Sequence, residues 1–182
     1  MDTMRIAMFL DIDFIVDPRV ENEARELANA GFEVHLFTLA YRLDQDQVDD
    51  LGYMKVFRYA MPNLVYKLSA LAYTFPIYHW LVSKKIKLFL SDVQPNSLHI
   101  HDMVIAQAVF DVAAGRPLPI TLDLHENRPA IMAFYPHLQK WTGKLLISLR
   151  RWHKKQLELA QRAEHLVLVA EEAYTYYSSA KK

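Results

Sequence analysis

Short apolar runs recur along the chain, separated by longer segments whose apolar positions repeat every three or four residues. Apolar runs of this length are typical of strands that are buried on both faces of a parallel sheet, and a run that alternates with polar residues also favours a strand. The pattern predicts six strands, at Arg5–Leu10, Val34–Thr38, Met54–Tyr59, Ser97–His101, Ile120–Leu124 and Leu166–Val169.

The segments between these strands carry helix signals. Asp17 followed by Pro18 favours a helix start, because aspartate accepts hydrogen bonds from free amides and proline suits the first helical position; Gly31 then ends this helix. A second helical stretch begins at Asn63, and Pro76 is expected to kink it or divide it in two. Further helices are predicted at Met103–Ala114, His137–Arg162 and Glu171–Tyr177, and residues 41–53 are expected to form a surface loop.

Strands that alternate with helices indicate an α/β domain with a mainly parallel sheet and helices on both faces. The length of 182 residues fits one domain, so residues 1–182 are taken as a single unit. In such folds ligands bind beyond the carboxyl ends of the strands. The loops after the predicted strands are therefore where functional residues are expected.

The charge balance narrows the classes of partner. The chain has 21 basic and 21 acidic side chains, which argues against a protein that binds nucleic acid non-specifically. The balance is uneven along the sequence, since residues 1–50 hold 4 basic and 12 acidic side chains. Without cysteine there can be no disulfide, thiolate metal site or cysteine nucleophile, and the expected location is the cytoplasm.

Two apolar segments are candidates for a secretory signal and a membrane-spanning helix, and neither has the pattern that such a segment requires. The start of the chain meets Asp11 after a short apolar run, so it is interpreted as a strand and not as a secretory signal. The stretch from Leu64 to Val82 is interrupted by Lys67, Pro76 and His79, whereas a spanning helix needs roughly 20 mostly apolar residues. A transmembrane segment is not predicted.

The glycine and aspartate positions bear on two kinds of phosphate chemistry. No glycine-rich dinucleotide or P-loop pattern occurs, although the helix start after Asp17 remains a candidate anion site. Asp11 and Asp13 follow the first strand as the two aspartates of a haloacid-dehalogenase-like phosphatase do, which makes that activity an alternative. Against it, Ile15 stands where that family prefers threonine or valine, and no later aspartate pair suits Mg²⁺.

The most informative segment is ITLDLHENRP, in which Asp123 and His125 fall on one side of a strand end. Polar residues of both charges follow directly. A histidine here can donate a hydrogen bond to a sugar hydroxyl, the carboxylate of Glu126 can accept a proton, and Arg128 can balance phosphate charge. The structural alternative is that Asn127 caps a helix and Arg128 pairs with Glu126.

The segment HIHD places His99, His101 and Asp102 at the end of another strand. His99 and His101 share one face, as a metal-binding pair would, but two histidines alone do not predict a zinc site, and none is expected. Asp102 is equally suited to capping the next helix and to a place in an active site.

The predicted helix at 137–162 is amphipathic and basic. Its apolar stripe is expected to hold Leu138, Trp141, Leu145, Leu149 and Trp152, opposite Lys140, Lys144, Arg151 and Lys155. The stripe is expected to pack in the core with the basic face in water, and the alternative is peripheral contact with an anionic membrane on its inner face. A further alternative function is therefore a non-catalytic module that binds a saccharide or a membrane.

Four segments together resemble the amino-terminal domain of retaining GT-B glycosyltransferases of family 4: MRIAMFL, DPRVENEARELANAGFEVHLFTL, LHIHDM and PITLDLHENRPA. The resemblance spans the chain, and between residues 41 and 95 it extends only to the order of elements. It implies a Rossmann-like three-layer α/β/α domain that forms the acceptor-side half of a two-domain enzyme. The donor-binding carboxyl-terminal domain would lie outside this chain.

The resemblance also implies the roles of individual residues. A sugar would pass from a nucleotide-sugar to a saccharide or lipid-linked acceptor without a metal or other cofactor, and the isolated domain would be inactive. The loop of His125 would reach the transferred sugar and the loop of Asp102 would line the same cleft, so His125, Asp102 and Glu126 are the candidate catalytic residues. The candidate substrate-binding residues are Asp17, Arg19, His101, Asn127 and Arg128.

Overall fold

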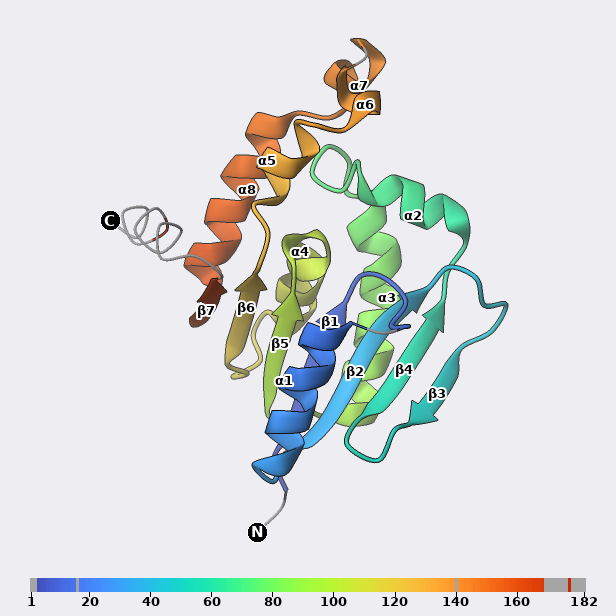
Figure 1. The fold of residues 1–182 in the computed structure, drawn as a ribbon, viewed down its shortest axis with the longest axis vertical. Coiled ribbons are helices and arrows are strands. Elements are labelled where there is room, and N and C mark those ends of the chain that lie inside the picture. Colours follow the sequence, from blue (N-terminus) through green and yellow to red (C-terminus); the bar gives the residue numbers. More distant parts are fainter. Residues whose placement is uncertain (1–2, 16, 140, 169–176, 178–182) are drawn as a thin grey trace.

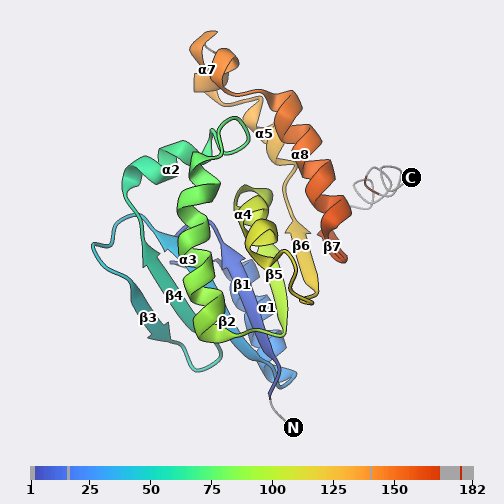
Figure 2. The same ribbon diagram turned by 180° about the vertical axis from the view of Figure 1, so that it is seen from behind.

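The computed structural model describes residues 3–15, 17–139, 141–168 and 177. They form a seven-stranded sheet in the order β3-β4-β2-β1-β5-β6-β7, with helices on both faces (Figures 1 and 2). All neighbouring strands are parallel except β3, which is antiparallel to β4. The strands are β1 (Arg5–Leu10), β2 (Glu33–Ala40), β3 (Gln47–Asp50), β4 (Lys55–Ala60), β5 (Ser97–His101), β6 (Ile120–Leu124) and β7 (His165–Leu168).

The helices follow the strands in the alternation that the sequence predicts. They are α1 (Pro18–Asn29), α2 (Asn63–Ser69), α3 (Ile77–Val93), α4 (Met103–Ala113), α5 (Arg128–Met132), α6 (Pro136–Gln139), α7 (Trp141–Leu146) and α8 (Leu149–Arg162). As predicted, Pro76 separates two helices, α2 and α3. No helix in the described ranges is both long and apolar enough to cross a bilayer.

Two apolar clusters fill the layers on either side of the sheet. The larger one joins the sheet to α3, α4 and α8, which cover one face (Figure 2). The smaller one lies under α1, which covers the other face (Figure 1), and it joins Val20 and Ala24 to residues of β1, β2 and β4. The fold is thus a three-layer α/β/α domain with a mainly parallel sheet, as predicted.

The segment predicted as a loop at 41–53 contains strand β3, which corrects the prediction. Backbone pairing with β4 forms this strand, although only Val48 among its four residues is apolar. The carboxylate of Asp46 also accepts a hydrogen bond from the amide of Ala60, at 2.8 Å. Edge pairing of this kind leaves no apolar pattern, because both faces of the strand contact water.

The single helix predicted at 137–162 is three helices, α6, α7 and α8, and this prediction is wrong. The hydroxyl of Ser148 accepts a hydrogen bond from the amide of Arg151, at 3.4 Å, and so starts α8 anew. The predicted apolar stripe is broken as well, since Trp152 is 1% exposed but Trp141 is 76% exposed. The predicted strand at Leu166–Val169 is β7 up to Leu168, and the helix predicted at Glu171–Tyr177 lies, but for Tyr177, outside the described residues.

Candidate active site

The parallel strands end on one rim of the sheet, toward α2, α5 and α7 in Figure 1, and polar side chains gather there. Asp11 follows β1, Asp102 follows β5, and His125 follows β6. One atom each of Asp102, His125 and Glu126 lies within 4.8 Å of the others. The strand-end rule therefore brings together the three residues that the sequence analysis named as catalytic candidates.

Arg128 places a guanidinium group on this rim. Its Nη1 atom lies 3.6 Å from Oδ2 of Asp102 and 3.2 Å from Oε2 of Glu126. Burial by itself would lower the pKa of Arg128, but the charges of Asp102 and Asp11 outweigh it and raise the pKa. The guanidinium group of Arg128 therefore stays charged and contacts carboxylates from the loops after β5 and β6.

Asp102 combines a capping role with a place on the rim. Its Oδ1 accepts a hydrogen bond from the amide of Met103 at the start of α4, while Oδ2 faces Arg128. Its backbone has φ 69° and ψ 158°, a region that residues other than glycine rarely adopt and that costs on the order of 1–3 kcal/mol. Burial raises the pKa of Asp102, and Arg128 opposes the rise. Asp102 thus combines an unfavourable backbone conformation with a buried carboxyl group.

His125 is oriented from below by Asp123, a carboxylate that is 1% exposed at the end of β6. Nδ1 of His125 lies 3.6 Å from Oδ2 of Asp123, and this contact raises the pKa of the imidazole. Burial alone would raise the pKa of Asp123, yet its contacts with His101 and His125 and the charge of Arg19 hold that pKa below its ordinary value. Asp123 thus favours the protonated, cationic form of His125.

The other predicted substrate-binding residues lie beside this cluster in supporting positions. Asp17 caps α1 by accepting hydrogen bonds from the amides of Arg19 and Val20. Arg19 lies 3.4 Å from Asp17 and 3.7 Å from Asp123. Asn127 caps α5 through the amide of Ala130.

His101 is the one predicted substrate-binding residue without access to the surface, because its side chain is fully buried. Its Nδ1 lies 3.4 Å from Oδ2 of Asp123. His101 is therefore not exposed to a ligand at the rim, and Asp123 links it to His125.

Asp11 belongs to this site although the sequence analysis considered it only for a phosphatase. It is buried, it lines the adjoining cavity, and burial together with the charge of Asp102 raises its pKa to about 7. Asp11 directly follows β1, so the rule that ligands bind at the carboxyl ends of parallel strands could have predicted it as a site residue. Asp13 instead points to the sheet edge, where it forms an ion pair with Arg58 of β4.

A cavity of about 590 Å³ adjoins the rim between α2, α5 and α8. Its polar lining includes Asp11, Lys67 and Arg128, and its apolar lining includes Met132, Ile147 and Trp152. Lys67, Met132, Ile147 and Trp152 were not predicted as site residues, because they come together only through tertiary packing. The cavity is large enough for a small ligand with both polar and apolar parts.

Solved structures with the same arrangement define the class of fold. The sucrose-phosphate synthase of Thermosynechococcus elongatus superposes with a TM-score of 0.72 at 12% identity, covering 97% of this chain and 45% of that one. The UDP-forming α,α-trehalose-phosphate synthase of Burkholderia vietnamiensis gives a TM-score of 0.58 at 11% identity, with 97% and 42% covered. An Escherichia coli structure described as trehalose-6-phosphate bound with UDP-2-fluoro glucose gives 0.55 at 12% identity, with 97% and 42% covered. The fold is the Rossmann-like amino-terminal domain of GT-B proteins.

The family follows from the sequence. Residues 16–179 match the model of the glycosyl transferase 4-like domain, and the chain belongs to this family. No curated protein matches the chain. The chain spans less than half the length of the structural relatives named above, at 45% and 42%.

Proposed function

We propose that this chain is the acceptor-side domain of a two-domain glycosyltransferase. A sugar would be transferred, with retention of configuration, from a nucleotide-sugar held by a second domain to a saccharide or lipid-linked acceptor held by this one. The observation that carries the proposal is the convergence of His125, Asp102 and Arg128 beside a cavity, in a chain of this family. One structural relative is described as bound to a UDP-sugar analogue, which supports the class of donor.

The chemistry assigned to these residues is orientation and charge stabilisation. The cationic form of His125, favoured by Asp123, is suited to contact the transferred sugar and to offset the negative charge that builds up on the departing diphosphate. Arg128 adds a second positive charge, and Asp102 or Glu126 can accept the proton of the acceptor hydroxyl. No step of this scheme requires a metal ion or an organic cofactor.

The adjoining cavity is proposed to hold the acceptor. Its polar end, at Asp11 and Arg128, adjoins the catalytic rim, while Met132, Ile147 and Trp152 offer an apolar wall. A saccharide carrying an apolar group matches this combination, because hydroxyls would find charged partners and the apolar part would leave water. This supports the lipid-linked class of acceptor over a free sugar.

The phosphatase alternative is not favoured by the geometry. A haloacid-dehalogenase-like site needs both aspartates directed at one phosphoryl group, whereas Asp13 is held in the ion pair with Arg58. Arg58 also contacts Asp49 of β3, at 2.6 Å, which fixes it at the sheet edge.

In the two-domain protein, His125→Ala is expected to lower the turnover of nucleotide-sugar by at least about tenfold, a loss of about 1.4 kcal/mol of transition-state stabilisation. The measurement is release of nucleoside diphosphate in the presence of acceptor. His165→Ala is the matched control, because His165 is exposed on β7, and it should leave the rate unchanged. Unchanged turnover of the His125 variant would exclude this residue from the site, and absence of transfer in the unmodified protein would favour a binding module.

We further propose that the protein acts in the cytoplasm, peripherally at the inner face of a membrane, with contact through exposed residues of the 137–162 region and through Phe134, which precedes it. Phe134 is 84% exposed and Trp141 lies nearby in sequence on α7, while Arg150, Arg151 and Lys154 are exposed on α8. Exposed aromatic side chains next to basic ones suit the interface of an anionic bilayer, where each cation adds about 1 kcal/mol.

Co-sedimentation with vesicles containing anionic lipid tests this contact. The double substitution Phe134→Ser and Trp141→Ser is expected to reduce binding at least about tenfold, because both exposed aromatic groups are lost. Val48→Ser, on the distant edge strand β3, is the control and should bind as the unmodified chain does. Binding that ignores both the aromatic substitutions and added salt would contradict the proposal.

A further inference from the structure

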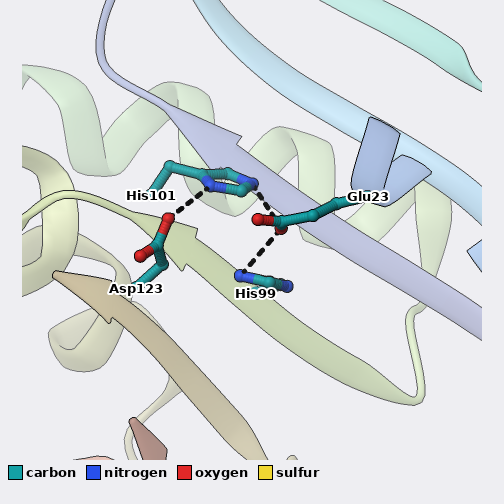
Figure 3. Close-up of side chains that lie close together, drawn as sticks. All are labelled: Glu23, His99, His101 and Asp123. Atoms are coloured by element: carbon teal, nitrogen blue, oxygen red, sulfur yellow. Dashed lines mark hydrogen bonds and ion pairs between the residues drawn. The ribbon is translucent and has the colours of Figure 1, made fainter. Parts of the chain in front are cut away.

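A second polar cluster lies on the sheet face that α1 partly covers, separate from the cavity. Side chains alternate along a strand, so β5 and β6 send their apolar residues to the opposite face and leave polar ones here. His99 pairs in register with Thr121, and His101 with Asp123. Glu23 reaches this polar strip from the second turn of α1 (Figure 3).

Two nitrogen atoms and one oxygen atom of this cluster face one another, and none of the three has a hydrogen bond within the described residues. They are Nε2 of His99, Nε2 of His101 and Oε2 of Glu23, and each has almost no contact with solvent. Oε2 of Glu23 lies 3.4 Å from His99 and 3.9 Å from His101, which is long for a hydrogen bond (Figure 3). Buried polar atoms of native proteins almost always have a partner. A single ligand that contacts all three atoms would give each of them a partner.

The spacing of the three atoms suits a metal ion. Two ligands of a tetrahedral zinc ion are about 3.3 Å apart, since zinc lies about 2.0 Å from each imidazole nitrogen or carboxylate oxygen. Histidine and glutamate are ligands that zinc accepts, and the cluster as a whole, with Asp123, has one ligand atom per residue within 4.8 Å of all the others.

Asp123 supplies the supporting contact that a metal-binding histidine commonly has. Its Oδ2 lies 3.4 Å from Nδ1 of His101, so a proton on Nδ1 leaves the lone pair of Nε2 directed toward Glu23. Among the described residues, Glu23 forms ion-pair contacts only with His99 and His101, whereas Asp123 also lies beside Arg19 and His125. The carboxylate of Glu23 can therefore balance part of the charge of a bound cation.

We propose that Glu23, His99 and His101 bind one divalent zinc ion, with Asp123 orienting His101 and water from the partly exposed side completing the coordination. The rings of His99 and His101 are stacked, with planes 17° from parallel, so coordination requires at least one ring to rotate about its Cβ–Cγ bond. The ion would tie α1 to β5 and so hold the helix that carries Arg19 against the sheet. His99 and His101 alone did not predict a zinc site, and Glu23, which is distant in the sequence, supplies the third ligand.

The group at Asp102, His125 and Glu126 also has ligand atoms within 4.8 Å of one another, but it does not support the same proposal. Arg128 already contacts both of its carboxylates. A divalent cation there would have to displace or approach a guanidinium, which is electrostatically unfavourable.

Titration calorimetry of the chain with Zn²⁺, after treatment with a chelator, tests the proposal. One zinc ion per chain is expected, and Glu23→Gln and His99→Gln should each weaken binding by at least about tenfold. Both residues are partly exposed, so these variants should retain the native circular dichroism spectrum. Zinc should also raise the melting temperature of the unmodified chain but not that of Glu23→Gln.

Glu126→Gln is the matched control, because it removes one carboxylate from the other group and should leave zinc affinity unchanged. Absence of zinc binding, or equal binding by the Glu23 variant, would overturn the proposal. Loss of binding in the Glu126 variant alone would move the ion to the rim and overturn it as well. None of these readouts depends on glycosyl transfer, so the zinc site and the proposed function can fail independently.

Discussion

Replacing Trp152 by alanine is expected to lower the free energy of unfolding by about 3–5 kcal/mol, the usual cost of removing a large aromatic side chain from a packed core. Trp152 is 1% exposed on α8, and its ring meets that of Tyr73 edge to face at 4.8 Å between centroids. The substitution leaves a void in the cluster that joins α8 to α4 and the sheet. Urea unfolding measures the change.

Trp141→Ala is the matched control for this variant. Trp141 is 76% exposed on α7, so its removal should change the free energy of unfolding by less than about 0.5 kcal/mol. Comparable losses in both variants would show that the two tryptophans share one apolar stripe, as a continuous helix over 137–162 would require. The Trp152 variant should also bind acceptor less well, because Trp152 forms part of the cavity wall.

Asp11→Asn is expected to stabilise the protein at pH 8 and to change its stability little at pH 4. Burial and the charge of Asp102 raise the pKa of Asp11 from 3.8 to about 7, so the folded chain holds this proton more tightly than the unfolded chain. The native state therefore loses relative stability as pH rises from about 4 to about 7, by up to about 4 kcal/mol. Asparagine has no proton to lose and avoids this penalty.

Urea unfolding at a series of pH values checks this expectation. The difference in unfolding free energy between Asp11→Asn and the unmodified chain should grow from near zero at pH 4 to its full value above pH 7. Asp44→Asn, at an exposed position near the same end of the sheet, serves as the control and should run parallel to the unmodified chain. A constant offset for the Asp11 variant would mean that Asp11 titrates as an ordinary exposed carboxyl group.

The sequence predicted the strands that carry apolar residues on at least one face and missed β3, in which only Val48 is apolar. β1 and β2 are mostly apolar, and β5 alternates apolar with polar residues, because at least one face of each strand packs in the core. Both patterns can be recognised in a sequence. β3 is held by backbone hydrogen bonds to β4, which any residue can make. The division of the last helical region was missed because Ser148 restarts α8 while the apolar period continues almost unchanged in the sequence.

The candidate site was predictable to the extent that it depends on strand ends. His125 and Asp102 follow adjacent parallel strands, so the topology alone brings them to one rim. Contacts between a helix and the sheet depend on how the helix is rotated, which a single sequence does not show. For this reason neither the approach of Glu23 to His99 nor the part of the cavity wall formed by Lys67 and Ile147 was foreseen.

Strand β3 also affects how separate copies of the protein behave toward one another. A sheet edge with free amides and carbonyls recruits strands from other molecules, and β4 would be such an edge without its partner. The partner is only four residues long and carries Asp49 and Asp50, so a strand added by a neighbouring copy would gain few hydrogen bonds and would meet like charge. The short, polar strand β3 therefore makes edge-to-edge association into fibrils unfavourable at this side of the sheet.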